Sequence, residues 1–186
     1  MTLKEMKLKT LRLIEEVSPN NPNLTDDPDI AAKINDVTNQ IMFELARMKK
    51  IQKYVEMEVS AGDIVDFADI EKECGYEVFQ VNLFGGVNNI PKAGGTVYKI
   101  MESGVAEIDV SVYPERITAD TKDTYEFELS ADALEIMPYG IAADLLKSDV
   151  SVEYGSIYAT RYESMKQMLD PRYQMMSIYI EGGVNV

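Results

Sequence analysis

The sequence predicts an α+β protein in which a helical bundle, made of two N-terminal and two C-terminal helices, is interrupted by an antiparallel β-sandwich-like insertion. Apolar residues recur every three or four positions near both ends of the chain, which is typical of amphipathic helices, and every second position in the middle, which is typical of strands. The predicted domains are a helical bundle at 1–50 and 131–170, a β-rich insertion at 51–130, and an extended C-terminal arm at 171–186.

The N-terminal helices are predicted over residues 2–17 and from about residue 28 to residue 50. Thr2 and Glu5 have the spacing of a capping box at the start of the first helix, and Ser18-Pro19 ends it. The loop "SPNNPNLTDDPD" is rich in turn formers, and its aspartates precede the second helix, where acidic side chains are favourable. The second helix has an apolar stripe formed by Ile30, Ile34, Val37, Ile41, Leu45 and Met48.

Five or six short strands are predicted in the insertion. "YVEMEVSAG" alternates, with Glu56 and Glu58 on the face opposite the apolar residues, and "YEVFQVNLF" alternates as well. "GTVYKIMESGVAEIDVSVYPE" is interpreted as two strands joined in a hairpin near Glu102-Ser103-Gly104, and "TYEFELS" as a further strand. The number and spacing of these segments indicate a small antiparallel sandwich or barrel.

The helical period returns after Ser130. In "ADALEIMPYGIAADLLKSD", Pro138 either begins a new helix or kinks a single one. A last helix, capped by Asp149 or Ser151, is expected to end at about Leu169, and strand character follows in the tail "RYQMMSIYIEGGVNV".

Composition excludes much catalytic chemistry. The chain of 186 residues has no histidine and one cysteine, so it has no Ser-His-Asp or Cys-His pair, no histidine-ligated zinc and no internal disulfide. The acidic neighbours of Cys74 disfavour its thiolate, so this residue is expected to be inert. The N-terminal "MTLKEMKLKT" does not resemble a signal peptide and no apolar run is long enough to span a membrane, so folding in a cytoplasm is expected.

The net charge of −14 is concentrated in the insertion. Residues 1–60, 61–130 and 131–186 contribute −1, −9 and −4, respectively. Such a surface repels phosphates, so tight sequence-specific binding of DNA or RNA is not expected. A protein that surrounds DNA without gripping it can nevertheless be acidic.

Neither the glycine pairs nor the acidic clusters predict a catalytic, cofactor-binding or metal site. "FGGV" and "AGGT" lack the lysine and the strand–loop–helix context of a phosphate-binding loop, so their glycines are assigned to turns. Two acidic clusters contain the side chains of a cation site or a carboxylate pair, but neither follows the twelve-residue calcium-loop pattern and both are typical of a solvated face. They consist of Asp63, Asp66 and Asp69, and of Asp120, Asp123 and Glu126.

Two apolar segments near the C-terminus are the candidate interfaces. Tyr154, Tyr158 and Tyr162 recur every four residues, and without a basic surround they indicate a helix-packing face, within one subunit or between subunits. The tail is more apolar than a free terminus should be, and it is either a strand docked on its own sheet or an arm that adds to a neighbouring subunit. Its candidate interface residues are Met175, Met176, Ile178, Tyr179 and Ile180.

The C-terminal part of the chain contains "PYGIAADLL" at 138–146, followed by "KSD", and "YATRY" at 158–162 with Leu169. These stretches resemble the closing helices of tailed-bacteriophage head–tail connector proteins, also called neck or adaptor proteins. The order of helical bundle and β insertion is similar to that family over most of the chain. The resemblance implies a non-enzymatic virion protein, made in the bacterial host cytoplasm, that assembles as a homo-oligomeric ring, commonly of twelve copies.

In that family the ring lies beneath the portal protein, contacts tail or head-closure proteins, and extends the channel through which DNA leaves. DNA would only pass through the lumen, where a negative surface lets it slide, and the C-terminal arm would reach into the portal. No cofactor and no membrane is implied. Two alternatives remain open: another phage structural component (tail completion, baseplate or capsid decoration), or a carbohydrate-binding or glycan-processing β module, against which the absence of tryptophan counts.

Overall fold

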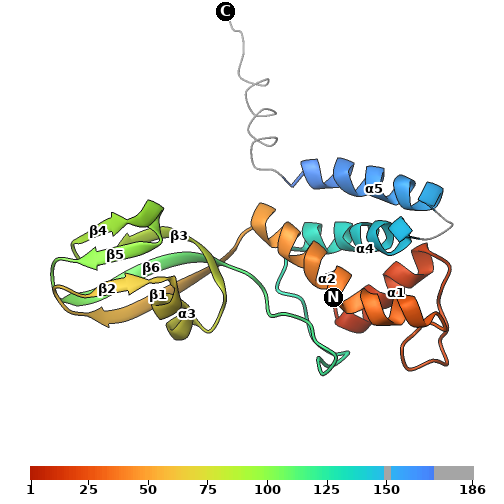
Figure 1. The fold of residues 1–186 in the computed structure, drawn as a ribbon, viewed down its shortest axis with the longest axis horizontal. Helices are drawn as coiled ribbons and strands as arrows, with labels where there is room; N and C mark the ends of the chain where they lie inside the picture. The colour runs from red at the N-terminus through yellow and green to blue at the C-terminus, as the bar shows by residue number, and fades with distance from the viewer. Residues whose placement is uncertain (149–151, 170–186) are drawn as a thin grey trace, which may run out of the picture. The chain divides into compact units, whose positions relative to one another are not determined.

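The computed structural model describes residues 1–148 and 152–169, which form five α-helices and two small antiparallel sheets (Figure 1). The predicted α+β class is confirmed. The chain divides into two compact units, and each is described by itself. The helical unit comprises Met1–Lys49 and the chain from Arg116 onward, and the β unit comprises Lys50–Glu115.

The N-terminal helices of the helical unit begin where their caps predict. Helix α1 spans Leu3–Leu13, and the capping box between Thr2 and Glu5 is present, with both reciprocal hydrogen bonds formed. Helix α2 spans Pro28–Met48, and the carboxylate of Asp27 accepts hydrogen bonds from the first backbone amides. Helix α1 ends four residues earlier than expected.

The C-terminal helices of this unit pack closely. Helix α4 spans Ala131–Leu145 without interruption, so Pro138 does not begin a new helix, and the short helix η2 (Leu146–Ser148) follows it. Helix α5 spans Val152–Gln167. A Cβ atom at Gly140 would lie 2.8 Å from Cε2 of Tyr162 on α5, so only glycine fits at this point of α4.

Residues 116–130, which were predicted to lie in the β-rich insertion, group with the helices. The side chain of Asn39 on α2 holds their start, because its Nδ2 donates to the Ile117 carbonyl at 2.7 Å and its Oδ1 accepts from the Ile117 amide at 2.8 Å. The strand expected in "TYEFELS" is wrong. Only Glu126 forms a β-bridge, to Thr2, because its neighbour in space is the first turn of α1 and not another strand.

The β unit contains two three-stranded antiparallel sheets, in the orders β1-β6-β3 and β2-β5-β4. The hairpin expected at 102–104 is wrong, because the two strands that flank it belong to different sheets: β5 pairs with β2 and β4, whereas β6 pairs with β1 and β3. The strands are β1 (Ile51–Val59), β2 (Ile64–Asp66), β3 (Val78–Gly85), β4 (Asn89–Lys92), β5 (Val97–Ile100) and β6 (Gly104–Val112), with a short helix η1 (Ala93–Gly95) before β5.

Helix α3 (Phe67–Cys74) lies between β2 and β3 and was not predicted. Asp66 and Asp69 form its capping box, and Gly75 ends it in the left-handed conformation, at φ 75°. Ile70 of α3 is fully buried and joins a core to which both sheets contribute. That core contains Val55, Val59, Val65, Ile70, Val78, Ile100, Ala106, Ile108, Val110 and Val112.

None of the helices within the described ranges is both long enough and apolar enough to cross a bilayer.

Candidate interfaces on helix α5 and on the β1–β6–β3 sheet

The three predicted tyrosines of α5 lie in three different environments. Tyr162 is 5% exposed, Tyr158 is half-buried, and Tyr154 is 64% exposed. The reason is helical geometry, because each step of four residues turns the side chain by about 40° around the axis, so Tyr154 and Tyr162 differ by about 80°. The stripe is therefore partly a packing face within the helical unit and partly a free surface.

Tyr162 fixes α5 to α2. Its hydroxyl donates to Oε2 of Glu44 at 2.9 Å, while Nζ of Lys166 donates to Oε1 of the same carboxylate at 2.7 Å. Burial, followed by the negative charge of Glu44, raises the pKa of Tyr162 well above the ordinary value for tyrosine. The carboxylate of Glu44 is thus held by two donors from consecutive turns of α5.

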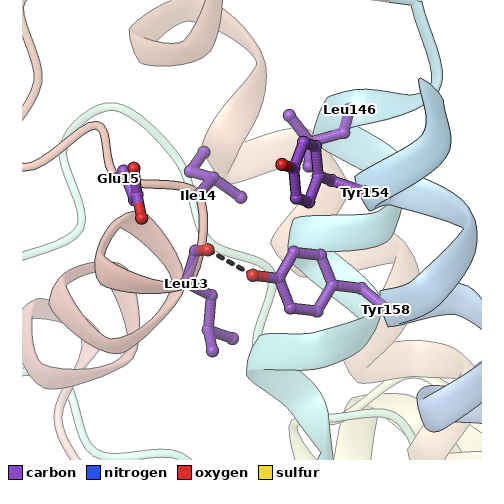
Figure 2. Close-up of a pocket in the computed structure, with 6 residues that line it drawn as sticks. All are labelled: Leu13, Ile14, Glu15, Leu146, Tyr154 and Tyr158. Atoms are coloured by element: carbon purple, nitrogen blue, oxygen red, sulfur yellow. Dashed lines mark hydrogen bonds between the residues drawn. The ribbon is translucent and has the colours of Figure 1, made fainter. Parts of the chain in front are cut away.

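Tyr158 fixes α5 to the end of α1. Its hydroxyl donates a hydrogen bond to the carbonyl oxygen of Leu13, one of the last carbonyls of α1, which have no partner within the helix (Figure 2). The side chains of Leu13, Ile14, Glu15, Leu146, Tyr154 and Tyr158 line a small pocket of about 240 Å³ at this junction (Figure 2).

The side of α5 that faces away from this packing carries exposed apolar residues that the spacing of the tyrosines did not indicate. Ile157 is 60% exposed and Met168 is 64% exposed, comparable to Tyr154. An open depression lies on the same side and is lined by Ser156, Ile157, Thr160, Arg161, Ser164 and Met165. We refer to Tyr154 and Ile157 on α5, together with Met168 directly after its last residue, as the outer stripe of α5. Exposed apolar side chains along one side of a helix make this surface a candidate interface.

A second exposed surface lies in the β unit, on the side of the β1–β6–β3 sheet that faces away from the core. Glu56 on β1 is directly opposite Glu107 on β6. Asp109 on β6 lies between Tyr54 on β1 and Leu83 on β3, and it is opposite both. We refer to this surface as the acidic sheet face. It consists of Tyr54, Glu56, Glu58, Leu83, Val105, Glu107 and Asp109.

The acidic sheet face has a negative potential that acts on its own tyrosine. Partial desolvation, a hydrogen bond to Glu56 and the charges of Glu107 and Asp109 raise the pKa of Tyr54. The alternation of Glu56 and Glu58 was visible in the sequence. The register that places Glu107 and Asp109 beside them was not, because it depends on pairing between strands about 50 residues apart.

The carboxylates of the first acidic cluster have structural roles. Asp66 and Asp69 cap α3, and the carboxylate of Asp63 accepts from the Ser60 amide at 2.8 Å. The second cluster, Asp120, Asp123 and Glu126, is exposed. Within residues 1–148 and 152–169, no group of three or more Cys, Asp or Glu side chains is arranged to hold a metal ion.

The remaining predicted interface residues, Met175, Met176, Ile178, Tyr179 and Ile180, lie outside the described residues. Comparison of the sequence with models of known protein families and with characterised proteins found no match.

Proposed function

We propose that this protein is a non-enzymatic structural component of a bacteriophage virion: an adaptor ring that joins the capsid portal to the tail and extends the DNA exit channel. The observation that carries this proposal is the outer stripe of α5. The helix is fixed on its inner side by Tyr158 and Tyr162, yet it presents Tyr154, Ile157 and Met168 to solvent, as expected of a helix whose second face contacts an assembly partner.

Two further features support the proposal. The stretch that contains α4 and α5 is the one that resembles head–tail connector proteins, and the β unit is inserted between the two halves of the helical unit, as in that family. The net charge of −14 suits a wall along which DNA slides without adhering.

Within this proposal, the outer stripe of α5 and the arm at 171–186 bind the portal. A contact of this kind is centred on a few apolar anchors that lose their exposure on binding. Tyr154 and Ile157 are such anchors, because they lie one turn apart on the same side of the helix.

The test is the mass of particles formed with the portal protein encoded in the same genome, measured by size-exclusion chromatography with light scattering. We expect a portal-bound ring. The double variant Ile157→Ser/Met168→Ser should fold normally and lose portal binding, whereas Lys33→Ser/Asp36→Ser, at exposed positions of α2, should retain it. A protein that stays monomeric with portal present, and that instead binds or hydrolyses a glycan, would contradict the proposal.

A further inference from the structure

The acidic sheet face lowers the stability of the isolated folded chain. Like charges placed directly opposite each other on neighbouring strands are destabilising, and Glu56 and Glu107 form such a pair. No lysine or arginine of the described residues forms an ion pair with Glu56, Glu58, Glu107 or Asp109. Tyr54, at 57% exposure, and Leu83, at 58%, add apolar surface beside these carboxylates. This face therefore suits a partner that brings positive charge together with an apolar group.

Helix α1 of the same chain has that chemistry. It carries four basic side chains against one acidic side chain, Glu5, in a protein whose net charge is −14. Lys4, Leu8 and Arg12 follow one another at intervals of four residues and so lie on one side of the helix. Lys4 and Arg12 are exposed, with the half-buried Leu8 between them.

The two surfaces also match in size. Lys4 and Arg12 are separated by about 12 Å along the helix axis, from a rise of about 1.5 Å per residue. Glu58, which is opposite Val105, and Asp109 are separated by about 13 Å along the strand direction, because Val105 and Asp109 are four residues apart on β6 at a rise of about 3.3 Å per residue. Both basic residues of α1 can therefore lie over carboxylates of the sheet at the same time, one beside Glu58 and the other beside Asp109.

From this complementarity we infer that α1 of one copy of this chain docks on the acidic sheet face of the next copy. The inference rests on the proposed function, because it supplies the contact between neighbouring subunits of the ring. Two different surfaces meet in this contact, so the association is head-to-tail, and such contacts close into a ring when the rotation between copies permits it. The outer stripe of α5 remains free for the portal.

Charge reversal tests this contact. The helix variant Lys4→Glu/Arg12→Glu makes both surfaces acidic, and the sheet variant Glu56→Lys/Glu107→Lys/Asp109→Lys makes both basic, because of the four carboxylates of the face only Glu58 then remains. We expect each variant alone to have the mass of a monomer by light scattering, with an unchanged circular dichroism spectrum. Mixed in equal amounts, they should form rings that contain both chains at a ratio of 1:1, because every junction then joins opposite charges. High salt should weaken the wild-type ring.

Matched controls change the same number of charges at exposed sites elsewhere: Lys33→Glu/Lys122→Glu for the helix variant and Glu73→Lys/Glu77→Lys/Asp120→Lys for the sheet variant. Both controls should assemble as the wild type does. If the helix and sheet variants each assemble alone, or if their mixture stays monomeric, the inference is wrong while the wild-type ring still supports the proposed function.

If the sheet variant forms normal rings and loses only portal binding, the acidic sheet face binds a different protein, which also overturns the inference. A wild-type protein that forms no ring with or without portal contradicts the proposed function itself, and the inference with it.

Discussion

The hydroxyl of Tyr162 donates a hydrogen bond to Oε2 of Glu44 at 2.9 Å, which ties the last described helix to α2, more than a hundred residues earlier in the chain. Replacing Tyr162 with Phe removes this bond and should lower the free energy of unfolding by about 0.5–1.5 kcal/mol. Replacing it with Ala also leaves a cavity and should cost about 3–5 kcal/mol, measured by urea unfolding.

Tyr154 is the matched control for Tyr162, because it lies on the same helix and is 64% exposed. Tyr154→Ala should change the free energy of unfolding by at most about 0.5 kcal/mol, as expected for a surface substitution. Equal losses at the two positions would contradict the packing described for α5.

Alkaline pH should destabilise the protein through Tyr162. Because burial and the charge of Glu44 raise the pKa of this hydroxyl, the folded state keeps its proton at a pH where the unfolded chain ionises. The stability contributed by this group is complete below the unfolded tyrosine pKa of about 10 and falls as the pH rises above it. The urea midpoint of the wild type should therefore decrease more steeply between pH 9 and about pH 11 than that of Tyr162→Phe. Parallel curves for the two proteins would show that Tyr162 is not protected from ionisation.

Gly140→Ala should destabilise the helical unit although alanine is the better helix former. The added Cβ atom would lie 2.8 Å from Tyr162 Cε2 and 3.0 Å from Ile41 Cγ2, so α4 must move or the ring must shift. Overpacking of this kind costs about 1–3 kcal/mol. In the double variant Gly140→Ala/Tyr162→Leu, the loss should be smaller than the sum of the single losses, because the shorter side chain relieves the collision. A stabilised Gly140→Ala variant would mean that the two helices are farther apart.

Asn39→Leu should detach residues 116–130 from α2. Asn39 is buried and makes two hydrogen bonds to the backbone of Ile117, so the substitution leaves an amide and a carbonyl without partners, each worth about 1–3 kcal/mol. Hydrogen exchange should show faster exchange at Ile117. Asn35→Ala, which removes a longer contact of 3.4 Å to the Thr118 carbonyl, should have a smaller effect. An unchanged exchange rate at Ile117 would contradict this role of Asn39.

Glu15→Gly should stabilise the protein. Glu15 follows the end of α1 with φ at 61°, in the left-handed conformation, and its amide donates to Arg12 while the Glu16 amide donates to Leu11, as in a Schellman motif. Glycine adopts this conformation without the steric cost of a Cβ atom, so a gain of up to about 1 kcal/mol is expected in urea unfolding. Glu16→Gly, one residue later, should give no gain, and a similar gain at both positions would contradict the strain assigned to Glu15.

Local signals in the sequence predicted what depends on a few neighbouring residues. The capping box of Thr2 and Glu5 and the start of α2 behind Asp27 were found because the cap and its partners are adjacent in the chain. Helix α3 was missed although Asp66 and Asp69 formed a readable cap, because the helix has only eight residues and alternating segments precede and follow it.

The predictions that were wrong concern which strands pair with each other, because pairing joins residues that are far apart in the sequence. The segments joined at 102–104 have alternating patterns that fit a hairpin, and nothing within them shows that β5 and β6 belong to different sheets. The candidate interface was partly predicted: the spacing of the three tyrosines identified α5, but the spacing alone does not show which side of the helix is covered. Ile157 and Met168 became candidates only when the contacts of Tyr158 and Tyr162 were known.

We propose that this chain forms a ring on a portal, and electron microscopy of the purified protein mixed with its portal protein examines this proposal. We expect end-on views of closed rings with a central channel, coaxial with the portal, and a stoichiometry set by head-to-tail contacts. Portal particles without added density, beside a protein that sediments as a monomer, would contradict it.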